Sequence, residues 1–193
     1  MLASARRDGV QITAETCPHY LTLAAEEVPD GGTPFKCSPP LREAANREAL
    51  WDGLAAGILD QVVSDHSPST PEMKDINGGD FADAWGGISS LQLASAVVWT
   101  EASRRGYGLA DIVRLMAERP ARLAGLDSKG AIRVGADADL AVFAPEAQFV
   151  VDPAALHHKN KLTPYEGREL RGVVRRTLLR GQPIVDEAKG TLR

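Results

Sequence analysis

The 193-residue sequence contains few cysteines, few histidines and no long apolar run. Its two cysteines, Cys17 and Cys37, form neither a CxxC metal motif nor a disulfide framework, so we expect free thiols in a reducing compartment. No apolar segment approaches the roughly 20 residues that a membrane span needs, and charges interrupt residues 1–10, where a secretion signal would be apolar. These absences exclude a disulfide scaffold and a membrane span, and they favour the cytoplasm.

The charge pattern excludes a further class of partner. The sequence has 22 basic and 26 acidic residues, which gives a formal net charge of −4. Its basic residues occur singly or in pairs and form no stripe that would neutralise phosphates, so we expect no nucleic-acid partner. With 44% hydrophobic residues, the chain can bury a core, which excludes a disordered protein.

The first half of the chain has the pattern strand, helix, strand. Residues 11–16 alternate and carry β-branched side chains, which predicts a short strand, and apolar residues recur at helical spacing over residues 41–59. Residues 61–65 (QVVSD) are a short apolar run with a polar end, typical of a buried parallel strand whose tip reaches a site. The Pro- and Gly-containing loop at residues 66–88 is longer than ordinary connections, so we expect it to be functional.

The second half changes from helical to β-like composition. Helical patterns cover residues 89–105 and 109–123. Short β-like runs follow at residues 132–134, 140–143, 149–151 and 173–179. We therefore predict an α/β domain over residues 1–127 and part of a small β domain over residues 128–193, with the boundary within residues 125–129.

Asp65 is the strongest candidate for a functional residue. A carboxylate at the tip of a buried strand can serve as a catalytic acid or base or as a metal ligand, although a helix cap or a loop hydrogen bond would also explain it. The adjoining His66 is another candidate ligand or proton carrier. His19 lies just past the first strand, where a site role and a loop hydrogen bond are both open. We expect His157 and His158 to be a solvated surface pair, because neighbouring strand residues face opposite ways.

Common catalytic signatures are missing from the sequence. It contains no GxxxxGK phosphate loop and no GxGxxG, GxSxG or HExxH motif. Trp85-Gly86-Gly87 would let backbone approach a ligand closely, although a plain turn explains it slightly better. Ser38 lies in a rigid Cys-Ser-Pro-Pro segment and offers a hydroxyl and backbone groups. Residue chemistry alone therefore gives one acid/base candidate and too few ligands for a complete metal centre.

Five segments of the chain resemble the cyclic amidohydrolases, in the order in which that family has them. They are residues 15–21 (ETCPHYL), 38–42 (SPPLR), 63–68 (VSDHSP), 130–140 (GAIRVGADADL) and 164–167 (PYEG). The resemblance covers essentially the whole chain, which matches the C-terminal part of the enzymes in that family. Residues 84–88 (AWGGI) are similar to the allantoinase branch, whereas dihydropyrimidinases and hydantoinases usually carry Pro-Asn-Gly there.

The resemblance implies a metal-dependent (β/α)₈ barrel with a small β-sandwich, in which two zinc-like ions bridged by hydroxide hydrolyse the cyclic amide allantoin to allantoate. Residues 11–16 and 61–65 would be the seventh and eighth barrel strands. Asp65 would be the last metal ligand and the catalytic acid/base that moves a proton from the attacking hydroxide to the leaving nitrogen. Ser38 and Gly86 match positions where relatives bind the cyclic amide.

The chain also departs from that family. The His-x-His, the carboxylated lysine and the two single histidines that complete the family's metal site are absent, as are the first six strands. We therefore expect a fragment that is inactive alone and whose complete enzyme is a homo-oligomer. Two alternatives stay open: hydantoinase, dihydropyrimidinase or dihydroorotase activity on the same framework, and a non-catalytic binding module.

Overall fold

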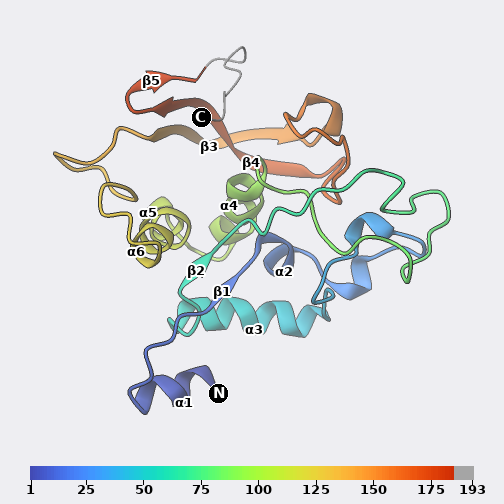
Figure 1. Ribbon diagram of the computed structural model, residues 1–193, viewed down its shortest axis with the longest axis horizontal. Helices are drawn as coiled ribbons and strands as arrows, with labels where there is room; N and C mark the ends of the chain where they lie inside the picture. The colour runs from blue at the N-terminus through green and yellow to red at the C-terminus, as the bar shows by residue number, and fades with distance from the viewer. Residues whose placement is uncertain (185–193) are drawn as a thin grey trace.

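The computed structural model describes residues 1–184 and has mixed α/β architecture (Figure 1). Its elements are α1 (Leu2–Arg7), β1 (Glu15–Thr16), α2 (Pro18–Thr22), η1 (Ala25–Glu27), η2 (Thr33–Phe35), α3 (Ala44–Ala55), β2 (Gln61–Val62), α4 (Ala94–Arg104), α5 (Leu109–Val113), η3 (Arg114–Glu118), α6 (Arg119–Leu123), β3 (Leu140–Val150), η4 (Pro153–Ala155), β4 (Glu169–Leu179) and β5 (Gln182–Pro183). The predicted second domain, residues 128–193, includes residues 185–193, which lie outside the described part. No helix among residues 1–184 is long and apolar enough to cross a membrane.

Strands β1 and β2 pair in parallel, and helix α3 connects them. Thr16 lies opposite Val62, and the ladder continues where Val63 N donates to Thr16 O at 3.0 Å. The predicted order strand, helix, strand is therefore confirmed. Both strands and the helix are shorter than predicted, and residues 11–13 are not a strand, because a strand needs a neighbour to bond and the pairing begins only at Ala14.

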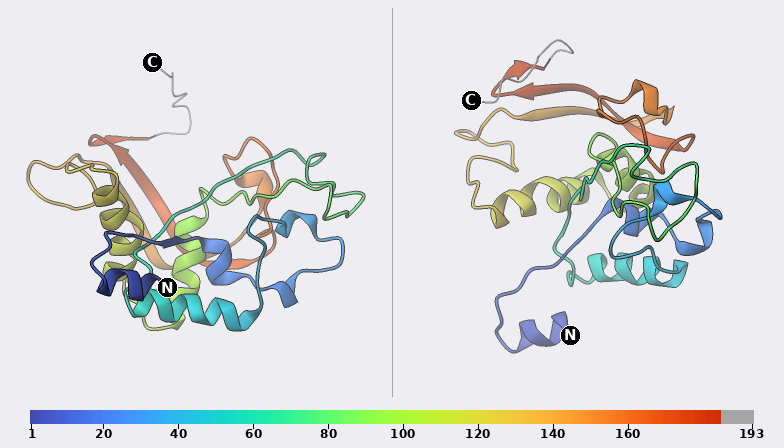
Figure 2. Two further views of the ribbon diagram at one scale, coloured as in Figure 1. Left: turned by 60° about the horizontal axis from the view of Figure 1, so that its bottom comes forward. Right: turned by 45° about the vertical axis from the view of Figure 1, so that its right-hand side comes forward.

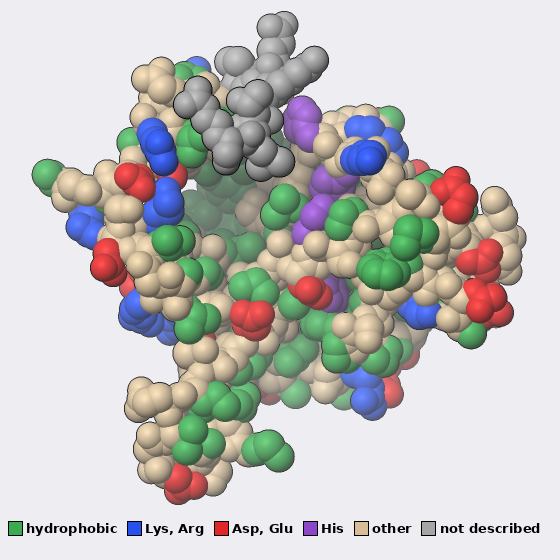
Figure 3. Space-filling view, viewed as in Figure 1, with side chains coloured by type: hydrophobic (Ala, Val, Ile, Leu, Met, Phe, Trp, Pro, Cys, Tyr) green, Lys and Arg blue, Asp and Glu red, His purple; other side chains and the backbone are tan. Residues whose placement is uncertain are grey.

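Helix α4 lies between this parallel pair and the β3-β4-β5 sheet (Figures 1 and 2). Its face bearing Val98 and Trp99 packs with Trp51 of α3 and Val62 of β2 in one buried cluster. Its neighbouring residue Val97 belongs to a second buried cluster, which reaches the β3-β4 sheet. An apolar helix face on either side thus joins the two sheets into one core. In the space-filling view, hydrophobic side chains line a hollow that has charged side chains along its left side (Figure 3).

The predicted helix at residues 109–123 is present but is interrupted in its middle. It consists of α5, a π-helical turn at Arg114–Glu118 and α6. Pro120 has no N–H to donate to the carbonyl four residues earlier, and a widened turn is a common adjustment next to such a missing bond.

The β-like composition after residue 128 forms fewer, longer strands than predicted. The runs at 140–143 and 149–151 lie almost entirely in the single strand β3, which pairs antiparallel with β4. The pairing register between the two strands shifts at two places along β3, as it does at a β-bulge. The prediction of a strand at residues 132–134 is wrong. Ile132 and Val134 are 91% and 102% exposed in an irregular segment, and no strand within residues 1–184 pairs with them.

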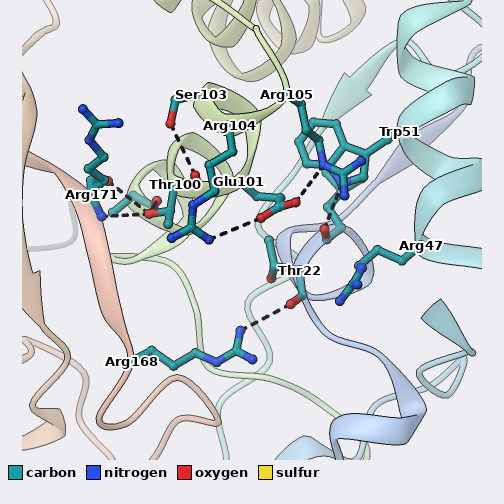
Figure 4. Close-up of polar contacts among 12 residues, drawn as sticks. Thr22, Arg47, Trp51, Thr100, Glu101, Ser103, Arg104, Arg105, Arg168 and Arg171 are labelled. Atoms are coloured by element: carbon teal, nitrogen blue, oxygen red, sulfur yellow. Dashed lines mark hydrogen bonds and ion pairs between the residues drawn. The ribbon is translucent and has the colours of Figure 1, made fainter.

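Polar contacts join the β3-β4 sheet to helices α4 and α2, and some of them border a pocket of about 390 Å³ (Figure 4). Arg171 N donates to Thr100 Oγ1 at 2.8 Å, and Arg168 donates from its guanidinium to Thr22 O at 3.3 Å. Trp99 Nε1 donates to Pro145 O at 2.9 Å. These bonds join β3, β4 and the residue that precedes β4 to helices α4 and α2.

Gly172→Ala tests the close approach of β4 to α4. Gly172 has φ +94°, and an added Cβ would lie 2.3 Å from Phe143 and 2.8 Å from Trp99. We expect it to lower the free energy of unfolding by about 2–4 kcal/mol through clash and backbone strain, measured by urea unfolding. Gly167→Ala is the matched control, because Gly167 also has positive φ but open space around it, and about 1 kcal/mol is expected there. Equal losses in the two variants would contradict this packing.

Candidate active site

The carboxyl ends of β1 and β2 bring three potential ligands together. Cys17 and His19 follow β1, and Asp65 follows β2. Because the strands are parallel, their ends lie at one edge. The Cys17 sulfur, a ring nitrogen of His19 and a carboxylate oxygen of Asp65 all lie within 4.8 Å of one another.

His19 is completely buried, yet neither of its ring nitrogens has a hydrogen-bond partner among the described residues. Burial lowers its pKa to about 4, so the ring is neutral at pH 7. Its Nε2 lies 3.8 Å from Asp65 Oδ2. The sequence left two roles open for His19, a loop hydrogen bond and a place in the site. Among the described residues its ring makes no hydrogen bond, and it lies beside the candidate carboxylate.

Asp65 has an unusual backbone and an accessible side chain. Its φ is +45°, a left-handed conformation that aspartate adopts more readily than most residues. Its side chain is 54% exposed, whereas the neighbouring Cys17 and His19 are buried. The carboxylate can therefore meet a small molecule from solvent while its two neighbours lie behind it.

Cys17 is the member of this cluster that sequence reasoning missed. Both cysteines are free, as expected, and the structure buries both of them. Burial, with the negative charges of Asp65 and Glu15 adding to it, raises the pKa of the Cys17 thiol to about 12. The available signal was the Cys-x-His spacing directly after a predicted strand, which places a sulfur and an imidazole on one short turn.

His66 and His158 have structural contacts. Nδ1 of His66 accepts from the backbone N–H groups of Ser90 and Leu91, both at 3.0 Å. The prediction of a solvated pair is wrong for His158, which is 8% exposed, lies 5.0 Å from the His66 ring and contacts Ser89 Oγ at 3.0 Å. Residue 158 lies in an irregular segment folded against residues 89–92, so the strand argument does not apply. Histidine side chains gather on one face of the molecule (Figure 3).

The loops that carry Ser38 and Gly86 lie against each other. A Cβ added to Gly86 would lie 3.5 Å from Ser38 Cβ, and Gly87 N donates to Lys36 O at 3.0 Å. Burial raises the pKa of the Cys37 thiol, and the charge of Asp65 adds to this rise. The structure thus brings Ser38 and Gly86 together.

A buried lysine, which the sequence did not single out, holds these two loops. Lys74 is 3% exposed and donates to Lys36 O at 2.8 Å, the same carbonyl that accepts from Gly87. Burial lowers its pKa to about 8. No pattern around a single lysine in a long loop indicates such burial.

The cluster at the strand tips suits a divalent metal ion. Thiolate, imidazole and carboxylate are the donors that Zn²⁺ prefers in proteins. The two unpartnered nitrogens of His19 and the exposed carboxylate of Asp65 fit that requirement.

Known sequences that are similar to this chain come from one enzyme family. The model of the amidohydrolase family matches residues 74–185. The chain is 58% identical over 191 residues to an allantoinase of Streptomyces avermitilis and 47% identical to one of Arabidopsis thaliana. These matches cover 99% and 98% of the chain but only 42% and 38% of the relatives. The chain thus spans about two fifths of their length.

Solved structures show the same architecture. A D-hydantoinase superposes with a TM-score of 0.88 at 32% identity and covers 95% of this chain and 41% of its own. The dihydropyrimidinase from Brevibacillus agri gives 0.87 at 35% identity, again over 95% of this chain and 41% of that one. The predicted fold class, the last strands of an α/β amidohydrolase domain with their helices, is confirmed.

Two alanine substitutions test how closely the backbone packs at Gly86 and at Gly87. A Cβ on Gly87 would lie 2.3 Å from Ser67 Oγ and 2.9 Å from Ser67 O, whereas one on Gly86 makes ordinary contacts. We expect Gly87→Ala to lower the free energy of unfolding by about 1–3 kcal/mol and Gly86→Ala by less than about 0.5 kcal/mol, measured by urea unfolding. A Gly86→Ala variant as unstable as Gly87→Ala would contradict the described loop contact.

The buried neutral His19 predicts a pH-dependent stability. Its pKa of about 4 in the folded chain lies below the ordinary value of 6.5, so between these values the unfolded chain binds more protons. Stability is therefore lost as pH falls from 6.5 to 4, by at most about 3 kcal/mol from this residue. Burial also lowers the pKa of His66 and His158, which adds loss of the same sign.

His19→Gln isolates that contribution, because glutamine does not titrate. The difference in unfolding free energy between pH 7 and pH 4.5 should be clearly smaller in this variant than in the unaltered chain. An undiminished difference would mean that His19 is not buried neutral.

Proposed function

Because the chain belongs to the amidohydrolase family, we propose that it supplies the last two strands of a metal-dependent barrel hydrolase that opens the ring of allantoin. The likeness to allantoinases over nearly the whole chain carries this proposal. The Trp85-Gly86-Gly87 loop, which is similar to that branch, supports it.

Asp65 is the proposed acid/base and metal ligand. Its exposed carboxylate at the tip of β2 can accept a proton from the attacking water and deliver it to the leaving ring nitrogen. A bound zinc ion would polarise the amide carbonyl and favour ionisation of the water. Cys17 and His19 are buried, so the carboxylate is accessible only from its solvent side, where the substrate would bind.

Ser38 and Gly86 are the proposed binding residues for the cyclic amide. An amide edge presents one donor and one acceptor, and peptide groups offer the complementary pair. Gly86 lets its backbone approach a flat ring because it lacks a Cβ. The contact between their loops, fixed by Lys36 O, would hold both peptide groups at a constant separation.

A second candidate is hydrolysis of hydantoins or dihydropyrimidines. Solved structures with those names, such as the D-hydantoinase and the Brevibacillus agri dihydropyrimidinase, share this architecture. The reaction class, hydrolytic opening of a cyclic amide, is the same. Hydantoins share the five-membered ring of allantoin and differ from it in the side group, whereas dihydropyrimidines have a six-membered ring. We favour allantoin because the sequence relatives with higher identity are allantoinases.

Two further expectations belong to this proposal. A cytoplasmic location fits two buried cysteines that are both free thiols. A division near residue 127 fits the arrangement in which β1 to α6 precede the β3-β4-β5 sheet.

Complementation tests the proposed function. We would co-express the chain with the part of the Streptomyces avermitilis allantoinase that precedes the matched region, and measure allantoin loss with and without Zn²⁺. The chain alone should be inactive and the pair active only with metal. Asp65→Asn should then lower kcat at least about a hundredfold, because the amide cannot carry the proton.

Asp75→Asn is the matched control. Asp75 is another aspartate with a positive φ, +48°, but its carboxylate accepts from Asp80 N within the loop. This variant should keep full activity. An active pair that is indifferent to Asp65→Asn would refute the role of Asp65, and faster turnover of hydantoin or dihydrouracil than of allantoin would favour the second candidate.

A further inference from the structure

We propose that a small cavity beside Lys74 binds one halide ion, which would be chloride in a cell. The cavity has a volume of about 10 Å³ and lies between Pro34, the loop of residues 67–89 and residues 162–164. Three of the side chains that line it are Lys74, Ser69 and Ser67. Because this chain provides every wall, the proposal does not rest on the proposed hydrolase function.

Lys74 is a buried cation without a carboxylate partner in the described part of the chain. Its side chain is 3% exposed, and its amine donates to Lys36 O at 2.8 Å. A pKa of about 8 leaves this amine charged at pH 7. A buried charge is costly unless an opposite charge or hydrogen bonds compensate it, and a bound anion would provide both.

The side chains around the cavity have protons left to donate. A lysine amine can only donate, and the bond to Lys36 O uses one of the three protons of Lys74. The hydroxyl of Ser69 is buried and has no hydrogen-bond partner among the described residues, which is rare for a buried polar atom. Ser67 Oγ accepts from Trp85 Nε1 at 3.4 Å, which leaves the Ser67 proton free to donate. These three groups together call for an acceptor.

The size of the cavity and the kind of hydrogen bond select the ligand. A volume of about 10 Å³ holds one particle about the size of water, which excludes polyatomic anions such as phosphate, sulfate and carboxylates. A water molecule would fit, but it has two protons of its own to place and cannot balance the Lys74 charge. A halide ion accepts from every donor and balances that charge. Chloride is slightly larger than water, and the half-buried Ser67 and Leu162 give the cavity room to widen.

Thermal unfolding of the purified 193-residue chain tests the site, because a ligand of the folded state raises the melting temperature. We would replace sodium methanesulfonate by sodium chloride at constant ionic strength and follow unfolding by circular dichroism. Methanesulfonate is polyatomic and too large for the cavity. We expect a saturating rise of about 3–6 °C once chloride exceeds its Kd about tenfold. Absence of a chloride-dependent rise overturns the proposal without any variant having to fold.

Two substitutions assign the effect to the cavity. Lys74→Met replaces the charged amine by an apolar side chain of similar length and should abolish the rise. Ser69→Ala removes one donor and should weaken chloride binding about three- to tenfold. Lys36→Met is the matched control, because the Lys36 amine donates to Ala82 O at 3.2 Å and Lys36 does not line the cavity. This control should keep the full rise, and a rise that survives Lys74→Met would overturn the proposal.

Crystals of the unaltered chain grown with sodium bromide locate the ion directly, because bromide scatters X-rays anomalously near its absorption edge. We expect an anomalous peak inside the cavity, within hydrogen-bond distance of Lys74 Nζ and Ser69 Oγ. A water molecule in the cavity, with bromide bound only at the surface, would overturn the proposal.

Discussion

The parallel register of β1 against β2 is the constraint on which the candidate site depends. Thr16 pairs with Val62, and the Thr16 carbonyl accepts from Val63 just before the chain leaves the sheet. Side chains alternate along a strand, so a slip by one residue would turn every side chain of β2 to the other face. The buried Val62 fixes the register through the core of α3 and α4, and that core thereby fixes where Asp65 emerges.

Much of this framework could be predicted from the sequence because it depends on local periodicity. The apolar spacing of α3 and the short apolar run of β2 are properties of consecutive residues, and they placed Asp65 at a strand tip. The contact between His19 and Asp65 could not be predicted in the same way. It joins two segments 46 positions apart, and only the pairing of their strands brings them together.

The wrong predictions have the same origin. Residues 132–134 have β-like composition, but a strand exists only where a neighbour bonds to it, and none does so there. The position of His158 among β-like runs predicts a surface side chain, yet an irregular segment places it against Ser89. Lys74 shows the limit most clearly, since burial of a charged side chain follows from how loops pack and not from its neighbours in sequence.

The carbonyl of Lys36 accepts from both the buried Lys74 nitrogen and the Gly87 amide, so it links three chain segments through one oxygen. Moving either loop away would leave a buried amine or amide without an acceptor, at a cost of roughly 1–3 kcal/mol. Partial opening of one loop alone is therefore disfavoured. The two walls that carry Ser38 and Gly86 form one cooperative unit, so that local unfolding would expose both at the same time or neither.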